Sequence, residues 1–161
     1  MNQGRKLVKL GLIQMRMEVD PAKNLEKAVR MIRKAARRDA NIVCLPELFT
    51  TRYFAQYEGQ DLSDEERGAF LETIPGQVVD TLCRVALENG VVIIGGSIYE
   101  KDGDRLFNTS AVIDSNGVLL GIYRKTHIPH DENFFEQHYF APGDTGFKVF
   151  DTHFGKISDL I

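Results

Sequence analysis

Apolar runs and amphipathic segments alternate along the first half of the chain. The run Ile42–Leu45 is too short for a helix and suits a strand buried on both faces, which Pro46 ends because it lacks an N–H. Residues 6–15 are rich in Leu, Val and Ile and predict an earlier, central strand. Between these strands, Asp20 and Pro21 predict an N-cap and first helical position, followed by apolar residues at helical spacing. This strand-helix-strand order predicts parallel pairing.

A second helix and a further buried strand follow. The helix runs from about Gln77 to Glu88 and ends at Asn89-Gly90, a sequence typical of C-caps. Residues 91–100 then form one apolar stretch that predicts a strand. Between the two helices, residues 53–67 mix aromatic and acidic side chains, and we interpret them as a loop with a short helix near Ser63.

Two tight turns organise the next part of the chain. Residues 101–104 and 115–117 carry the Gly, Asp and Asn residues that turns require, and they separate apolar strands at 106–114 and 118–123. Strands joined by such turns are antiparallel. We therefore expect one α/β domain with a mixed sheet, and we interpret residues 154–161 as the start of a further strand that the sequence cuts off partway.

Composition narrows the class of protein. The chain has 161 residues, of which 43% are hydrophobic and 27% charged, as expected for one globular domain. A net charge of −3 gives no general attraction to nucleic acid or anionic membranes. Lys9 interrupts the first apolar run and no cleavage site follows it, so we expect a cytoplasmic protein. The two cysteines, Cys44 and Cys83, lie in apolar patterns and are expected to be free thiols.

An acidic residue follows directly on the buried strand at Ile42–Leu45. Glu47 comes just after Pro46 and is followed by two apolar residues, Leu48 and Phe49. A helix cap or a surface ion pair would explain such an acid, because buried acids are scarce. The alternative is chemistry, since α/β proteins keep their sites at strand ends.

A pair of cations ends the last predicted strand. Arg124 and Lys125 precede Pro129, and side-chain alternation predicts that one of the two faces inward and the other outward. A basic pair in water is one interpretation. The other is an ammonium near a carboxylate, where it stabilises a developing oxyanion, and this interpretation depends on Glu47.

The segment 132–147 is rich in aromatic residues, with Glu136 among them and a Pro-Gly-Asp sequence behind. It predicts a loop that covers an apolar site or packs on its own sheet. Two weaker signals lead to no site. His127 and His130 lack a third zinc ligand, and Asn108-Thr109-Ser110 matches a glycosylation acceptor, which matters only in a secreted protein.

Three motifs together resemble the nitrilase, or carbon-nitrogen hydrolase, superfamily. They are LPELF at 45–49, YRKTHIP at 123–129 and YFAPGDTGFKVF at 139–150. Within that superfamily the chain is most similar to the N-carbamoylputrescine amidases. The resemblance covers residues 1–161 as a single domain, about the N-terminal half of the family's usual length. It implies an α-β-β-α sandwich with a mixed sheet, here incomplete, and homo-oligomers assembled through helix faces.

The resemblance also implies a set of site residues. Glu47 matches the family's general base, Lys125 its catalytic lysine, and Glu136 a second glutamate that supports the lysine. The nucleophilic cysteine is expected immediately after Ile161. Ser158 and Asp159 differ from the small and apolar residues expected before it. For the substrate pocket, the candidate residues near these motifs are Tyr53, Phe54 and Glu132.

The implied reaction is the hydrolysis of a non-peptide C–N bond, with N-carbamoylputrescine giving putrescine, carbon dioxide and ammonia. We expect no metal or organic cofactor, and a small amide or carbamoyl amine as the only partner besides further copies of the chain. Two alternatives stay open: another amide hydrolase, such as a β-ureidopropionase-like enzyme, and a truncated protein without activity.

Overall fold

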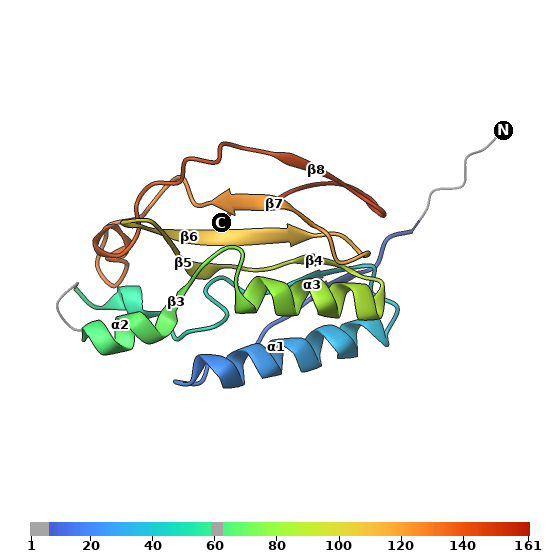
Figure 1. The fold of residues 1–161 in the computed structure, drawn as a ribbon, viewed down its shortest axis with the longest axis horizontal. Helices are drawn as coiled ribbons and strands as arrows, with labels where there is room; N and C mark the ends of the chain where they lie inside the picture. The colour runs from blue at the N-terminus through green and yellow to red at the C-terminus, as the bar shows by residue number, and fades with distance from the viewer. Residues whose placement is uncertain (1–6, 59–62) are drawn as a thin grey trace.

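The computed structural model describes residues 7–58 and 63–161, which form a mixed sheet with two long helices along one face (Figure 1). A separate two-stranded hairpin follows the last strand of the sheet. No helix within the described ranges is long and apolar enough to cross a bilayer. The helices are α1 (Pro21–Ala36), α2 (Asp64–Phe70) and α3 (Gln77–Asn89), with 3-10 turns η1 (Phe54–Gln56) and η2 (Glu136–His138). The strands are β1 (Leu10–Leu12), β2 (Ile42–Cys44), β3 (Leu71–Glu72), β4 (Val92–Ile94), β5 (Ile98–Asp102), β6 (Arg105–Ile113), β7 (Leu119–Arg124), β8 (Val149–Thr152) and β9 (Gly155–Ser158).

The sheet is parallel at its start and antiparallel afterwards, which confirms the predicted mixed sheet. β1, β2 and β4 are parallel neighbours. β4 and β5 both pair antiparallel with β6, and β7 pairs with it as well. Thr109 in β6 is opposite both Ile98 and Arg124, so β5 and β7 lie on the two sides of β6. β6 therefore occupies the middle of the sheet, between the strands that carry the motifs.

The prediction that the first strand is central is wrong. Among the described residues β1 pairs with β2 alone, which puts it at an edge of the sheet. It is three residues long, and Leu10 and Leu12 are 61% and 79% exposed. A run of apolar residues indicates a strand but does not say how many neighbours the strand has.

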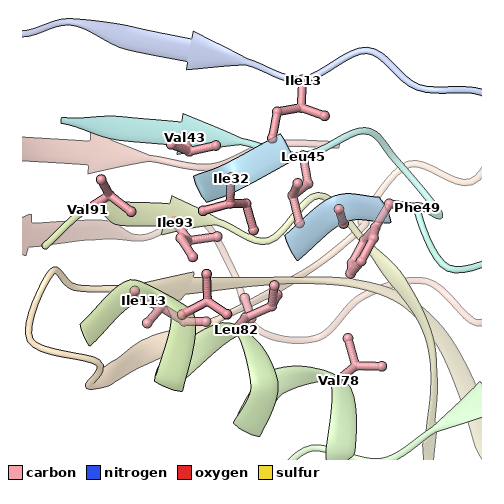
Figure 2. Packing of buried hydrophobic residues seen from close by; sticks show 14 of the residues in the cluster. Ile13, Ile32, Val43, Leu45, Phe49, Val78, Leu82, Val91, Ile93 and Ile113 are labelled. Atoms are coloured by element: carbon pink, nitrogen blue, oxygen red, sulfur yellow. The ribbon is translucent and has the colours of Figure 1, made fainter. Parts of the chain in front are cut away.

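Both long helices begin and end close to the predicted residues. The Asp20 side chain accepts the N–H of Ala22 at the start of α1, and Gly90 ends α3 in the left-handed conformation. Their apolar faces pack on one side of the sheet (Figure 2). The main core consists of residues from both helices and the strands above them, including Ile32, Val43, Val78, Leu82, Ile93 and Ile113.

The predicted strand over residues 91–100 is interrupted, and the interruption accommodates the segment that carries Glu47. Gly96 has a φ of +57°, and a Cβ there would lie 2.0 Å from the Pro46 carbonyl oxygen. The N–H of Ser97 donates to that same oxygen at 3.3 Å. The loop after β2 thus runs alongside the break between β4 and β5, where only glycine leaves enough space.

A second apolar cluster, built from aromatic rings, borders the end of the sheet. Tyr99 lies opposite Asn108 across β5 and β6, so both side chains point to the same face. Phe54 lies between Tyr99 and Phe70, with ring centroids 5.0 and 5.7 Å away. The remaining members of this cluster with fully buried side chains are Leu48, Ala55, Tyr139 and Phe140.

Candidate active site

Glu47 lies in a loop that backbone contacts hold tightly. The N–H of Leu48 donates to Ser97 Oγ at 2.9 Å, and the N–H of Phe49 donates to the Ser97 carbonyl at 3.1 Å. Leu48 has a φ of +46°, unusual for a residue with a branched side chain, and its side chain is buried with that of Phe49. Burial of these two apolar side chains fixes the loop and leaves Glu47 at the surface of the site.

Lys125 follows the last residue of β7 and is held by two backbone bonds. Its N–H donates to the Asn108 carbonyl at 2.9 Å, and its carbonyl accepts the N–H of Gly143 at 2.8 Å. A Cβ on Gly143 would lie 2.0 Å from the Arg124 carbonyl oxygen, so the Pro-Gly-Asp loop approaches this closely only because it has glycine there. The loop thus fixes the lysine backbone at the strand end.

The two candidate acids, Glu47 and Glu136, both contact the candidate lysine. Lys125 Nζ lies 2.9 Å from Glu47 Oε1 and 2.8 Å from Glu136 Oε2. The side chains of Lys125 and Glu136 are 9% and 3% exposed, whereas that of Glu47 is 42% exposed. The lysine therefore bridges a buried acid and an accessible one, an arrangement that three distant segments of the chain create.

The charges around Lys125 keep it protonated. Burial lowers its pKa, but hydrogen bonds to Glu136 and Glu47 outweigh this effect and raise the pKa above its ordinary value. The Tyr53 hydroxyl donates to Glu136 Oε1 at 3.0 Å. Burial and the neighbouring Glu136 raise the pKa of Tyr53, so its hydroxyl stays a donor at neutral pH. An ammonium at this point can stabilise negative charge on a bound substrate.

The Arg124 side chain points to the face of the sheet opposite to that of Lys125, and it contacts a different set of carboxylates. Its guanidinium donates to Glu100, Asp102 and Asp144 at 2.7 to 2.9 Å and lies over the Phe107 ring. Hydrogen bonding to Glu100 above all raises its pKa. The prediction that one cation of the pair faces outward is wrong. Both are less than 10% exposed, because the loop at 139–147 covers the strand end.

A cavity of about 810 Å³ opens beside the lysine. Its described lining combines Lys125, Thr126, His127 and Gln137 with the apolar residues Ile128, Pro129, Phe140 and Pro142. Two of the residues proposed for the pocket wall lie elsewhere: Phe54 is 3% exposed within the aromatic cluster, and Glu132 is exposed on the loop. Tyr53 reaches the site through Glu136.

Neither cysteine of the chain is an activated thiol. Burial raises the pKa of Cys44, with a smaller contribution from Asp159, and burial also raises the pKa of Cys83. Cys44 donates weakly to the Leu45 carbonyl, 3.6 Å away, and Cys83 packs against the main core. Their environments disfavour the thiolate that nucleophilic attack requires. Among the described residues, no cluster of three or more potential metal ligands occurs.

One residue of the site carried no functional expectation from sequence. Asn108 Nδ2 donates to Glu47 Oε1 at 2.8 Å, and the Asn108 side chain is fully buried. The sequence holds one signal that points to it. Asn108, Thr109 and Ser110 are three consecutive polar residues inside an otherwise apolar strand. Polar residues at buried strand positions need partners, and here Glu47 provides one.

Comparison with known proteins agrees with these motifs. The carbon-nitrogen hydrolase family model matches residues 9–161. An N-carbamoylputrescine amidase from Arabidopsis thaliana is 39% identical over 160 residues, covering 98% of this chain and 51% of that protein. A citrullinase from Francisella tularensis is 32% identical over 150 residues, covering 93% and 51%.

A solved structure shares the fold. Nit3 from Saccharomyces cerevisiae, a member of branch 10 of the nitrilase superfamily, aligns with a TM-score of 0.74 at 25% identity, over 94% of this chain and 54% of that one. The chain spans about half the length of the curated relatives it matches. Its mixed sheet with helices on one face corresponds to about half of the superfamily's fold. With the family match over residues 9–161 and the motif residues gathered at one strand end, the chain belongs to the carbon-nitrogen hydrolase family.

Proposed function

We propose that this chain supplies the general base and the oxyanion-stabilising lysine of an amidohydrolase acting on a carbamoyl amine, with N-carbamoylputrescine as substrate. The observation that carries the proposal is the position of Lys125 Nζ between Glu47 and Glu136, at 2.9 and 2.8 Å, beside a cavity. Support for the substrate comes from similarity to N-carbamoylputrescine amidases.

The proposed reaction begins with proton transfer to Glu47. Glu47 removes the proton of a cysteine thiol, for which we propose the position after Ile161, and the thiolate attacks the carbamoyl carbon. Lys125 stabilises the oxyanion that forms on the carbonyl oxygen. The C–N bond to the leaving nitrogen breaks as Glu47 returns its proton, which releases ammonia and leaves a carbamoyl thioester.

Water completes the cycle. Glu47 removes a proton from a water molecule, and the resulting hydroxide attacks the thioester carbon. The C–S bond then breaks, and the departing sulfur takes the proton back from Glu47, which restores the thiol and the carboxylate. The N-substituted carbamic acid then loses carbon dioxide and releases the amine, here putrescine. Glu136 and Tyr53 hold Lys125 through both half-reactions, since the hydroxyl donates to the carboxylate that contacts the ammonium. We further propose a cytoplasmic homo-oligomer in putrescine biosynthesis.

A second candidate substrate has specific support from the cavity. Its described lining contains Lys125 and His127 but no carboxylate, and Glu132 lies on the loop outside it. A lining without a carboxylate offers no partner to an ammonium tail, so it accommodates a substrate with a carboxylate tail, as in a β-ureido acid, as well. The similarity to a citrullinase is in keeping with a broader choice of carbamoyl substrates.

The test compares two substrates with the complete gene product. Ammonia release is measured with N-carbamoylputrescine and with N-carbamoyl-β-alanine, and the proposal expects a larger kcat/KM for the first. A larger value for the second would overturn the substrate but not the chemistry. If neither compound nor a simple aliphatic amide released ammonia, the proposed hydrolase function would be wrong. An intact mass near 18.2 kDa for that inactive product would favour a protein without activity.

A further inference from the structure

Two donors from different strands share one oxygen of Glu47. Asn108 Nδ2 donates to Oε1 at 2.8 Å, and Lys125 Nζ donates to the same Oε1 at 2.9 Å. No hydrogen bond from another described residue reaches Oε2. A carboxylate oxygen has two lone pairs in the plane of the group, so the two donors occupy those of Oε1. The carboxylate is thus held asymmetrically.

Asn108 is placed firmly enough to orient this group. It lies in β6, is 0% exposed, and has Tyr99 opposite it in β5. Its carbonyl accepts the N–H of Lys125 at 2.9 Å, so one residue holds the backbone of the lysine and the carboxylate of Glu47. Glu47 lies in a loop and is far more exposed, with 42% of its side chain accessible. The buried amide therefore determines where the accessible carboxylate lies.

The orientation of the Asn108 amide depends on the charge of Glu47. Asn108 Oδ1 is buried and has no hydrogen-bond partner. Turning the amide over would give Oδ1 a new position, but it would point an acceptor at the acceptor Oε1. The amide stays as it is because the donated bond to a carboxylate outweighs an unsatisfied carbonyl oxygen.

We propose that Asn108 is the positioning residue of the catalytic base, and that Glu47 accepts its proton on Oε2. This inference rests on the proposed function of Glu47. In the step, the S–H bond of the nucleophile breaks, its electron pair stays on sulfur, and an O–H bond forms at Oε2, which turns the carboxylate into a neutral acid. Oε1 keeps both donors throughout. The same Oε2 proton later goes to the leaving nitrogen.

The kinetic test replaces Asn108 by leucine, which has a similar size and no donor. Misplacing a catalytic group by about 1 Å costs on the order of 100-fold in rate, so we expect kcat to fall by about 100-fold with KM unchanged. Because a donor favours the charged form of a carboxylate, its loss moves the acidic limb of the pH–rate profile to higher pH. A merely structural role would lower the amount of folded enzyme without moving this limb.

Ser110→Ala is the matched control. Ser110 is on the same strand and face as Asn108 and is 0% exposed, and it makes no hydrogen bond to Glu47 or Lys125. We expect this variant to keep the wild-type kcat and pH profile. If Asn108→Leu does not fold, Asn108→Ser takes its place with the same expectations. An Asn108 variant that is folded and has the kinetics of Ser110→Ala would overturn the inference.

A second measurement needs neither turnover nor a change at Asn108. With 15N-asparagine labelling of the complete gene product, the side-chain N–H resonances of Asn108 should shift with pH as Glu47 changes charge. In Glu47→Gln that shift should disappear, while Ser110→Ala should retain it. An Asn108 resonance with the same pH response in Glu47→Gln as in the wild type would overturn the contact. The two failures are distinguishable. An inactive wild-type enzyme would reject the proposed function, whereas an unchanged pH response in Glu47→Gln would reject only the contact between Asn108 and Glu47.

Discussion

Arg124 and Lys125 are neighbours in the chain, but their side chains leave the sheet on opposite faces and enter different surroundings. The Arg124 guanidinium contacts three carboxylates, those of Glu100, Asp102 and Asp144, and an aromatic ring. Lys125 contacts two and lines a cavity. Both cations are buried and paired, so burial and pairing do not distinguish them. Access to a cavity distinguishes the residue available for chemistry from the residue that holds the fold.

Replacing Lys125 tests the difference between the two cations most directly. Lys125→Met removes the ammonium that contacts Glu47 and Glu136, and with it the donor to the oxyanion. We expect kcat to fall by at least about 10²- to 10³-fold, the usual cost of one such donor. Ammonia release by the purified variant measures the loss, with circular dichroism to verify folding. Activity close to that of the wild type would exclude Lys125 from the mechanism.

Arg124→Met should affect stability. It leaves the Glu100 side chain, which is 3% exposed, without its guanidinium partner. Breaking a buried ion pair typically lowers the free energy of unfolding by about 3–5 kcal/mol, measured by denaturant titration. Arg105→Met is the matched control, because its side chain is 55% exposed in its pair with Asp144 and should contribute about 1 kcal/mol or less. Equal losses in both variants would contradict the structural role of Arg124.

Tyr53→Phe tests how much the support of Glu136 contributes to the function of Lys125. It removes the hydroxyl that donates to Glu136 and leaves the ring in place. A single hydrogen bond contributes about 0.5–1.5 kcal/mol, so we expect a loss of roughly 2- to 10-fold in kcat. Tyr57→Phe, on a half-exposed ring outside the site, is the control and should be neutral. A loss in Tyr53→Phe as large as in Lys125→Met would mean that Tyr53 contacts the substrate itself.

The smallest effect is expected at Asp159, a buried acid that is outside both networks. Its Oδ2 has no partner, and burial raises its pKa, which the nearby Ser110 hydroxyl only partly offsets. The folded state therefore holds this proton more tightly than the unfolded state, and stability falls as pH rises from the ordinary carboxyl pKa to the raised one.

Asp159→Asn removes that pH dependence. We expect it to stabilise the protein by about 1 kcal/mol at neutral pH and to have little effect below about pH 3, where the acid is protonated in both states. Thermal unfolding across this pH range measures the difference. Asp151→Asn in β8, where the side chain is 80% exposed, is the control. Destabilisation by Asp159→Asn at neutral pH would indicate a partner for the carboxylate.

The helices and most strands followed from local sequence. Caps such as Asp20 and Gly90, apolar spacing and turn residues are local, and the structure has α1 and α3 close to where they were predicted. The edge position of β1 and the break at Gly95–Ser97 were not predicted. Both depend on contacts with other segments, since the break lies against the loop that begins at Pro46.

The site was predictable in part. Family resemblance assigned roles to Glu47, Lys125 and Glu136, and the structure brings these three side chains together. The packing of Phe54 and the contact of Asn108 with Glu47 are tertiary contacts between residues far apart in the chain, so the local sequence does not predict them. A polar residue within a buried strand was the only sequence signal for Asn108.

The central claim is that Glu47 is the base and Lys125 its partner, and turnover by Glu47→Gln tests it most directly. Glutamine keeps the size of the side chain but does not accept the proton. We predict that kcat falls by at least about 10²-fold while the thermal unfolding midpoint stays near that of the wild type. A folded Glu47→Gln enzyme with activity within a few-fold of the wild type would contradict the account.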